Sequence, residues 1–254
     1  SDIVLTHMNR VENIDISAIT AGSTVTITAQ SNTDGVTQIL DTGALGKTID
    51  ASAYGNAALT ISAGTGSDTV TLDGGQMSVI AAGGSNGSDT LALKGASSVT
   101  DGYFSNKTGF ETLNLTQMSG NITLGSNAVT SGMTTITDAG SNGKTIDASA
   151  DTAITAIILG SGNDTLKITK SQSIALTDNG GTDTLEITDQ ITSGGIAATS
   201  LSGIEKIQLA NATNTVTLNY DNKTIIGGNA NDTFQYAVAN FSTTDILDGG
   251  TAGT

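Results

Sequence analysis

The sequence predicts an all-β fold, a parallel β-solenoid of the β-roll or β-helix type, and three observations support this prediction. Short runs that alternate apolar and polar residues, such as Thr24-Val25-Thr26-Ile27-Thr28, are typical of strands. Turn-forming residues are abundant, with 32 Gly and twenty Asp against four Glu, and Pro is absent. Finally, similar turns and strands recur at a spacing near 20 residues.

Two repeated elements define a longer period. The octapeptide Gly-Lys-Thr-Ile-Asp-Ala-Ser-Ala is identical at residues 46–53 and 143–150, and a degenerate third copy begins at Asn222. An element of the form apolar-Glu-x-apolar-x-apolar contains Glu12, Glu111 and Glu205, which are 99 and 94 residues apart. These spacings indicate a superrepeat of about 95 residues.

A third element subdivides the superrepeat. It is a Gly-rich turn followed by Asp-Thr and an apolar residue, with its aspartates at Asp68, Asp89, Asp164, Asp183 and Asp232. Asp68 and Asp89 are 21 residues apart, and Asp164 and Asp183 are 19 apart, which is enough chain for two short strands and two turns. We therefore expect residues 1–254 to form one continuous solenoid of about twelve coils. Its superrepeats would span residues 1–100, 101–195 and 196–254, the last incomplete, in a fragment of a longer chain.

Each coil is expected to bury its apolar positions and expose its polar ones. In strands such as Val70-Thr71-Leu72 and Leu185-Glu186-Ile187, Val, Leu and Ile would point inward while Thr and Glu face water. An array of β-sandwich modules would also fit a period of about 95 residues. The 20-residue subdivision favours the solenoid, because sandwich strands do not repeat their turn chemistry at fixed intervals.

Charge and composition exclude several classes of function. The net charge of −15, with a single Arg, disfavours binding to nucleic acids or to anionic membrane surfaces. No stretch of about 18 apolar residues is present, so we expect no membrane insertion. Cys is absent and His7 is the only histidine, which excludes thiol chemistry and zinc sites of the His/Cys kind. We predict that the chain is not an enzyme.

The Gly-x-Gly-x-Asp-Thr-apolar turns resemble the nonapeptide repeat of the RTX family, Gly-Gly-x-Gly-x-Asp-x-apolar-x. The resemblance implies Ca²⁺ bound between the turns of successive coils by carboxylate and carbonyl oxygens. The implied acidic ligands are Asp68, Asp89, Asp164, Asp183 and Asp232. The implied carbonyl ligands lie around Gly64, Gly66, Gly84, Gly87, Gly160, Gly162, Gly227 and Gly228. In this chain each coil has only one copy of the motif, and Ala63, Leu159 and Ala230 replace glycines of the pattern.

For the acidic residues outside the Gly-rich turns we predict structural roles without a bound metal. An isolated Asp after Gly is usually a turn residue that accepts hydrogen bonds from nearby backbone N–H groups. We apply that interpretation to Asp50 and Asp147 of the octapeptide, as corner or ladder residues between coils. We expect Glu12, Glu111 and Glu205 to be solvated strand residues or partners in ion pairs.

The Glu element, clearest at Gly109-Phe110-Glu111-Thr112-Leu113, is similar to a motif of surface-layer proteins of Gram-negative bacteria. The resemblance implies a type I secreted structural protein of the cell surface that self-associates into a calcium-dependent lattice. Another region would anchor it to a cell-surface glycan or lipopolysaccharide. The alternatives are a stalk or binding module of a large RTX adhesin or exoprotein, and the secretion module of an exported enzyme.

Overall fold

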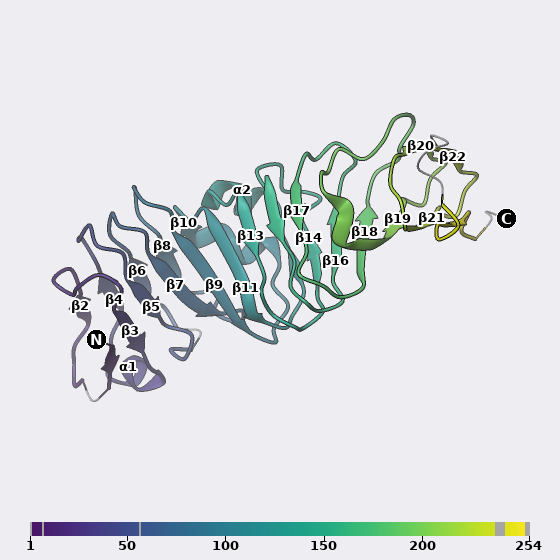
Figure 1. Ribbon diagram of the computed structural model, residues 1–254. Helices are drawn as coiled ribbons and strands as arrows, with labels where there is room; N and C mark the ends of the chain where they lie inside the picture. The colour runs from purple at the N-terminus through teal and green to yellow at the C-terminus, as the bar shows by residue number, and fades with distance from the viewer. Residues whose placement is uncertain (1, 7, 56, 237–241, 252–254) are drawn as a thin grey trace. The chain divides into compact units, whose positions relative to one another are not determined.

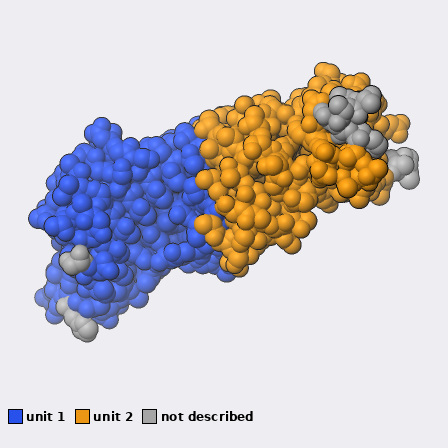
Figure 2. Space-filling view, viewed as in Figure 1, with its two compact units in different colours: residues 1–138 blue, residues 139–254 orange. Residues whose placement is uncertain are grey.

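The structure is a computed structural model that describes residues 2–6, 8–55, 57–236 and 242–251, so His7 lies outside the described residues. The chain divides into two compact units, residues 1–138 and residues 139–254, coloured blue and orange in Figure 2. Both consist of short parallel strands stacked coil upon coil (Figure 1), and together they form about 11 turns of a parallel β-solenoid. The predicted fold class is thus confirmed. The division into superrepeats at residues 100 and 195 stays a prediction.

Unit 1 contains two parallel sheets whose strands alternate along the chain. The first sheet contains, in spatial order, β1 (Ile3–Leu5), β3 (Thr24–Ile27), β5 (Thr48–Asp50), β7 (Thr69–Asp73), β9 (Thr90–Gly95), β11 (Thr112–Met118) and β13 (Thr135–Thr137). The second contains β2 (Asn13–Asp15), β4 (Gln38–Leu40), β6 (Thr60–Ser62), β8 (Ile80–Ala82) and β10 (Lys107–Thr108). The unit also includes β12 (Ile122–Thr123), the helices α1 (Ala29–Thr33) and α2 (Ser126–Ser131), and the 3₁₀ helix η1 (Asp101–Asn106). Two strands per coil is the arrangement that the 20-residue period predicts.

Unit 2 continues the same architecture with parallel pairing. One sheet contains β14 (Thr145–Asp147), β16 (Thr165–Ile168), β18 (Asp183–Ile187), β19 (Ile204–Gln208), β21 (Thr224–Ile226) and β23 (Ile246–Asp248). The remaining elements are the pairs β15 (Ala156–Ile158) with β17 (Ala175–Thr177) and β20 (Thr215–Leu218) with β22 (Thr233–Tyr236), together with the 3₁₀ helix η2 (Leu201–Gly203). No described helix of the chain is long and apolar enough to cross a membrane.

The core consists of apolar columns that run along the coils. Ile49 is in register with Val70, Val70 with Leu91, and Leu91 with Leu113. All four side chains are fully buried. Burying an aliphatic side chain of this size contributes roughly 1.5–3 kcal/mol, so each column stabilises several coils. In the strands of this column the alternation of buried and exposed positions follows the sequence pattern, except that Thr71 is also buried. Elsewhere the apolar strand residues Val4, Ile80 and Ile246 are exposed.

A glutamine fixes the turn that follows the octapeptide strand in both units. The Gln76 Nε2 donates to the Ala51 and Gly55 carbonyls at 2.9 Å each, and its Oε1 accepts the Asp73 N–H at 2.6 Å. Gln172 makes the same three bonds in unit 2, to Ala148 O, Asp151 O and Thr169 N–H. These bonds satisfy backbone groups of the turn, of which the Ala51 and Ala148 carbonyls belong to buried residues that have little access to water.

Candidate metal-binding ladders

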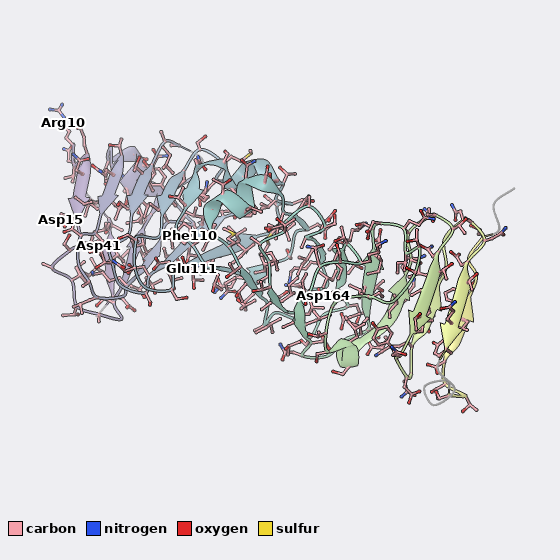
Figure 3. The ribbon with its side chains drawn as sticks, turned by 90° about the horizontal axis from the view of Figure 1, so that it is seen from above. Arg10, Asp15, Asp41, Phe110, Glu111 and Asp164 are labelled. Carbon is pink, nitrogen blue, oxygen red and sulfur yellow. The ribbon has the colours of Figure 1, made fainter. Side chains whose placement is uncertain are left out.

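Three acidic side chains of unit 1 form a ladder along the start of the first sheet, which we name the first ladder: Asp68, Asp89 and Glu111. Each carboxylate accepts a backbone N–H from the equivalent position one coil earlier. The donors are the N–H groups of Lys47, Asp68 and Asp89, and each bond is 2.7 Å long. Asp68 and Asp89 are 1% and 2% exposed. Glu111, the last member, is labelled in Figure 3.

Unit 2 repeats the arrangement in a second ladder of Asp164, Asp183 and Glu205. Its donors are the N–H groups of Lys144, Asp164 and Asp183, at 2.8, 2.6 and 2.8 Å. Asp164 and Asp183 are 1% and 0% exposed. The structure therefore brings together both predicted pairs, Asp68 with Asp89 and Asp164 with Asp183.

The register of the sheets explains why the acidic residues align. Thr69, immediately after Asp68, pairs with Thr48 and with Thr90, so each residue that precedes a strand stacks on its counterpart in the next coil. A carboxylate at this position reaches the N–H of the coil before it. Hydrogen bonds of backbone N–H groups to an ionised carboxylate are among the stronger ones in proteins.

A β-bulge explains why each ladder ends with glutamate. The register between β18 and β19 shifts at Asp183, which pairs with Ile204 while Thr184 pairs with Lys206, so that Glu205 is the extra residue. In unit 1, Glu111 N–H and Thr112 N–H both donate to Asp89 O. The extra residue lengthens the path between the backbone of the glutamate and the N–H donor one coil earlier, and the longer Glu side chain spans it. This replaces the predicted role of Glu111 and Glu205 as solvated or ion-paired residues, whereas Glu12 is exposed as expected.

A buried ion pair lies beside the first ladder. Lys47 Nζ contacts Asp41 Oδ2 at 2.5 Å, and both side chains are fully buried. Lys47 Nζ also donates to Leu45 O at 3.1 Å. The pair was missed by sequence reasoning, although one signal was available: Asp41 and Asp138 both lie six residues before the octapeptide lysine. Asp41 is labelled in Figure 3.

A second carboxyl accompanies the second ladder. Asp178 Oδ1 and Asp183 Oδ2 are both buried without a hydrogen-bond partner among the described residues, as is Asp68 Oδ2 in the first ladder. Asp178 begins the same turn as Asp183, and a Cβ on Gly203 in the next coil would lie 2.4 Å from the Asp178 Cβ. Sequence reasoning missed Asp178 because it lies outside the Gly-x-Gly-x-Asp pattern.

The glycines of the predicted sites stack backbone on backbone. A Cβ on Gly64 would lie 2.1 Å from Gly43 O, and one on Gly84 would lie 2.0 Å from Gly64 O. Gly84 and Gly87 also have φ angles of +134° and +101°, in the region that favours glycine. The carbonyl oxygens of Gly64 and Gly84 accept no hydrogen bond from the described residues. In unit 2, Gly160 and Gly162 are buried, as are Gly227 and Gly228 beside Asp232.

The remaining predicted residues have local partners. Asp232 is half-buried, and it accepts the Asn214 N–H and Nδ2 at 2.8 Å each and the Gly228 N–H at 3.1 Å. Asp50 accepts the Ser52 N–H and Oγ–H, and Asp147 does the same with Ser149. This confirms the corner role predicted for Asp50 and Asp147.

Burial raises the pKa of three ladder aspartates, Asp68, Asp89 and Asp183. Burial raises the pKa of Asp89 to about 6, and the neighbouring Asp68 and Glu111 carboxylates act in the same direction, against the Asp68 N–H bond that lowers it. The pKa of Asp183 is likewise raised, first by burial and also by Asp178 and Asp164. The pKa of Asp68 is raised by burial and by Asp41. A bound divalent cation would neutralise this charge.

These pKa shifts predict that, without divalent cations, the fold becomes less stable as the pH rises. A raised pKa means that the folded chain holds its proton where the unfolded chain, with an Asp pKa near 3.8, has lost it. The stabilisation is complete below about pH 4 and is lost as the pH rises through about 6 for Asp89, and through the raised pKa of Asp183. Thermal unfolding in cation-free buffer should therefore give a higher Tm at pH 4.5 than at pH 7.5.

The Asp89→Asn/Asp183→Asn double variant, which does not titrate at these positions, should reduce this difference in Tm. Asp2→Asn/Asp248→Asn, on exposed residues, serves as the matched control and should leave it unchanged. A wild-type Tm that rises from pH 4.5 to pH 7.5 would contradict the role assigned to these carboxyls.

The donor set suits an oxygen-seeking cation. Each ladder offers two buried aspartates one coil apart, with a carboxylate oxygen that has no hydrogen-bond partner on Asp68 and on Asp183. Calcium takes six to eight oxygen ligands, and backbone carbonyls count among them. Among the described residues, no group of three or more His, Cys, Asp or Glu side chains is arranged to hold a metal, so carbonyls would have to complete any site.

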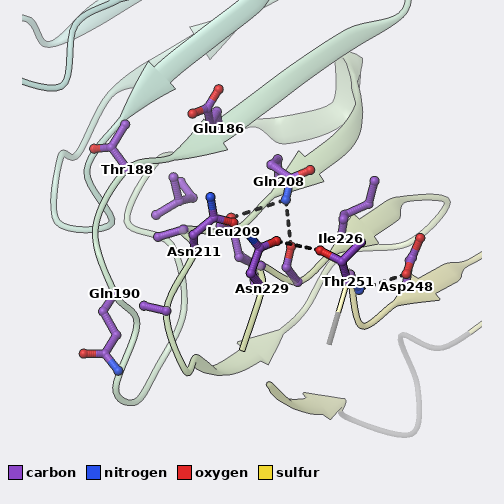
Figure 4. Close-up of a pocket in the computed structure, with 16 residues that line it drawn as sticks. Glu186, Thr188, Gln190, Gln208, Leu209, Asn211, Ile226, Asn229, Asp248 and Thr251 are labelled. Atoms are coloured by element: carbon purple, nitrogen blue, oxygen red, sulfur yellow. Dashed lines mark hydrogen bonds between the residues drawn. The ribbon is translucent and has the colours of Figure 1, made fainter. Parts of the chain in front are cut away.

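One cavity in unit 2 measures about 880 Å³ (Figure 4). Its polar groups largely bond one another: Gln208 Nε2 donates to Gly227 O at 2.7 Å, and Thr251 Oγ1 donates to Asn229 Oδ1 at 2.7 Å. A second cavity in this unit, of about 510 Å³, is lined in part by Glu205 of the second ladder.

Comparison of the chain with models of protein families, with curated proteins and with solved structures finds no match. The functional argument therefore depends on the geometry of the chain itself.

Proposed function

We propose that the chain is a structural segment of a secreted cell-surface protein, and that calcium stabilises its solenoid and permits its assembly into a surface lattice. The observation that carries the proposal is the pair of ladders, in which buried carboxylates recur once per coil. Buried charges of one sign repel one another unless they are neutralised. With a net charge of −15, the chain has few cations of its own to supply that neutralisation.

The proposed ions lie between successive turns. Asp68 and Asp89 would hold one ion with carbonyls near Gly64, Gly66, Gly84 and Gly87. Asp164 and Asp183 would hold another with carbonyls near Gly160 and Gly162, and Asp178 is a further candidate ligand there. Asp232, with Gly227 and Gly228, is the weakest site, because both of its carboxylate oxygens already accept hydrogen bonds.

Calcium binding at these sites would be coupled to folding. The ligands come together only when the coils stack, so the binding free energy contributes to the stability of the fold. Extracellular calcium modules bind with dissociation constants of about 10⁻⁴–10⁻³ M. A protein of this kind would remain unfolded during export and fold where calcium is millimolar. We propose a structural rather than a catalytic role for the described ladders.

The effect of calcium on stability is tested by thermal unfolding at pH 7.5, monitored by circular dichroism. For a site with a Kd of about 1 mM, 10 mM CaCl₂ should add about 1.4 kcal/mol per site relative to EGTA. The Asp68→Asn/Asp164→Asn variant should lose most of this gain. Magnesium at the same concentration is the ionic-strength control, and equal Tm values in calcium, magnesium and EGTA would refute the calcium sites.

Assembly is tested separately, by electron microscopy of the chain with and without calcium. A regular two-dimensional array supports the surface-layer proposal. Isolated fibres or single particles in calcium would instead favour a stalk or binding module of a large adhesin.

A further inference from the structure

The cavity of about 510 Å³ in unit 2 lies where η2 and the start of β19 face the turn between β20 and β21. Its volume is within the range of about 300–1,000 Å³ that is common for small-molecule sites. The residues that line it combine a cation, two carboxylates, an amide and an aromatic ring: Lys223, Glu205, Asp221, Asn222 and Tyr220. Of these five residues only Glu205 belongs to a ladder.

Lys223 is the lysine of the degenerate third octapeptide, and its side chain lacks the partner that Lys47 has. Lys47 follows Asp41, the first residue after β4, and its Nζ contacts that carboxylate at 2.5 Å. In the third copy the first residue after β20 is Asn219 rather than Asp, and the turn is shorter. Lys223 is only 7% exposed, yet its Nζ has a single acceptor among the described residues, Ser202 O at 3.4 Å.

A buried ammonium with one distant acceptor has unused hydrogen-bonding capacity, because it carries three donors. Burial lowers the pKa of Lys223, while the nearby Glu205, Asp221 and Asp245 carboxylates act in the opposite direction. Leaving a buried donor unsatisfied costs about 1–3 kcal/mol. A ligand that accepts from Lys223 inside the cavity would recover this cost.

The other residues that line the cavity offer further hydrogen-bond donors and acceptors and one aromatic ring. Glu205 uses its Oε2 for the Asp183 N–H, and nothing in the described part of the chain bonds its Oε1. The carboxylate of Asp221 and the amide of Asn222 are exposed, and Asn222 has a φ of +59°. Tyr220 is half-buried, with its hydroxyl directed to Ile196 O at 3.3 Å, so its ring offers an apolar surface.

We propose that this cavity binds a neutral sugar unit, with Lys223 and Asn222 donating to its hydroxyl oxygens and Glu205 and Asp221 accepting from its hydroxyl groups. Sugar hydroxyls both donate and accept, which matches a wall of mixed donors and acceptors. The C–H face of the ring would lie against the Tyr220 side chain. This inference does not depend on the calcium sites.

The charges around the cavity favour neutral sugars over charged ligands. Lys223 is outnumbered by the three carboxylates that act on it, Glu205, Asp221 and Asp245. An acidic sugar or a phosphate would therefore meet net repulsion. A cationic amino sugar would be attracted to the carboxylates, but its ammonium group would be repelled by the ammonium of Lys223.

The test is saturation-transfer difference NMR on the full chain, with calcium held constant. The probes are glucose, galactose, mannose and N-acetylglucosamine, with galacturonic acid and glucosamine as charged comparators. We expect at least one neutral sugar to bind with a Kd of about 1 mM. Lys223→Met should weaken that binding at least tenfold, whereas Lys206→Met, a strand lysine outside the cavity lining, should leave it unchanged.

A second variant distinguishes loss of sugar binding from loss of the fold. Asp221 is exposed, so Asp221→Asn should leave the circular dichroism spectrum unchanged and still weaken sugar binding several-fold. The proposal is overturned if none of the neutral sugars gives saturation transfer, or if only the charged comparators do. It is also overturned if both cavity variants bind as tightly as wild type.

Discussion

Replacing Asp41 by Ala is expected to lower the free energy of unfolding by about 3–5 kcal/mol. The substitution leaves the Lys47 ammonium inside the fold without its carboxylate, and both side chains of the pair are fully buried. Only the Leu45 carbonyl, at 3.1 Å, would still accept from Lys47 Nζ. Urea denaturation of the full chain in calcium measures the change, and hydrogen exchange should localise it to the coils around β3, β5 and β7.

Two control variants show whether the loss of stability comes from leaving a buried charge unpaired or from removing any ion pair. The Lys94–Asp50 ion pair has a similar distance, 2.7 Å, but its side chains are 29% and 22% exposed. Lys94→Met should therefore cost only about 0–1 kcal/mol. The Asp41→Leu/Lys47→Met double variant should recover most of the loss, because it removes both charges and retains apolar volume. Equal costs for Asp41→Ala and Lys94→Met would contradict this account.

Much of the fold could be predicted because the sequence repeats its turns. The spacing of Asp68 and Asp89 matches one coil, and the alternation in Val70-Thr71-Leu72 identifies the inward face. Both follow from rules that act along the chain, namely strand periodicity and turn chemistry. The stacking of the two predicted aspartate pairs follows from the same period.

The partners of the acidic residues could not be predicted in the same way. Whether a carboxylate accepts an N–H or pairs with a lysine depends on which groups of the next coil it meets. Glu111 accepts the N–H of Asp89, 22 positions earlier, and the extra residue at this point, which makes a glutamate necessary, has no signal in the sequence. Similarly, Asp178 lies near enough to Asp183 to raise the pKa of that carboxyl, and the Gly-x-Gly-x-Asp pattern does not include it.

The glycines were assigned by sequence as sources of carbonyl ligands, and the structure adds a steric reason for them. Adjacent coils approach so closely at these corners that no side chain fits between their backbones. At the Gly64 position, for example, the obstructing atom is the carbonyl oxygen of Gly43. The coils cannot move apart there without breaking the hydrogen bonds of the neighbouring ladder and strands.

Gly64→Ala is therefore expected to cost about 3 kcal/mol, at the upper end of overpacking, even though it adds only a methyl group. Its Cβ would lie 2.1 Å from Gly43 O, and the Cβ of Gly66→Ala would lie 2.4 Å from Gly46 N. Both obstructions are backbone atoms, which cannot rotate away as a side chain can. Thermal and urea unfolding in calcium would measure the loss.

Two other glycines of unit 1 serve as matched controls. Gly35 has a φ of +94° but nothing within 4 Å of its added Cβ, so Gly35→Ala should cost only the conformational strain of about 1–2 kcal/mol. Gly102 has no positive φ and its nearest neighbour would be 4.0 Å away, so Gly102→Ala should change stability by less than about 0.5 kcal/mol. If Gly64→Ala proves no worse than Gly102→Ala, the coils can separate at this corner, and close stacking does not explain its glycines.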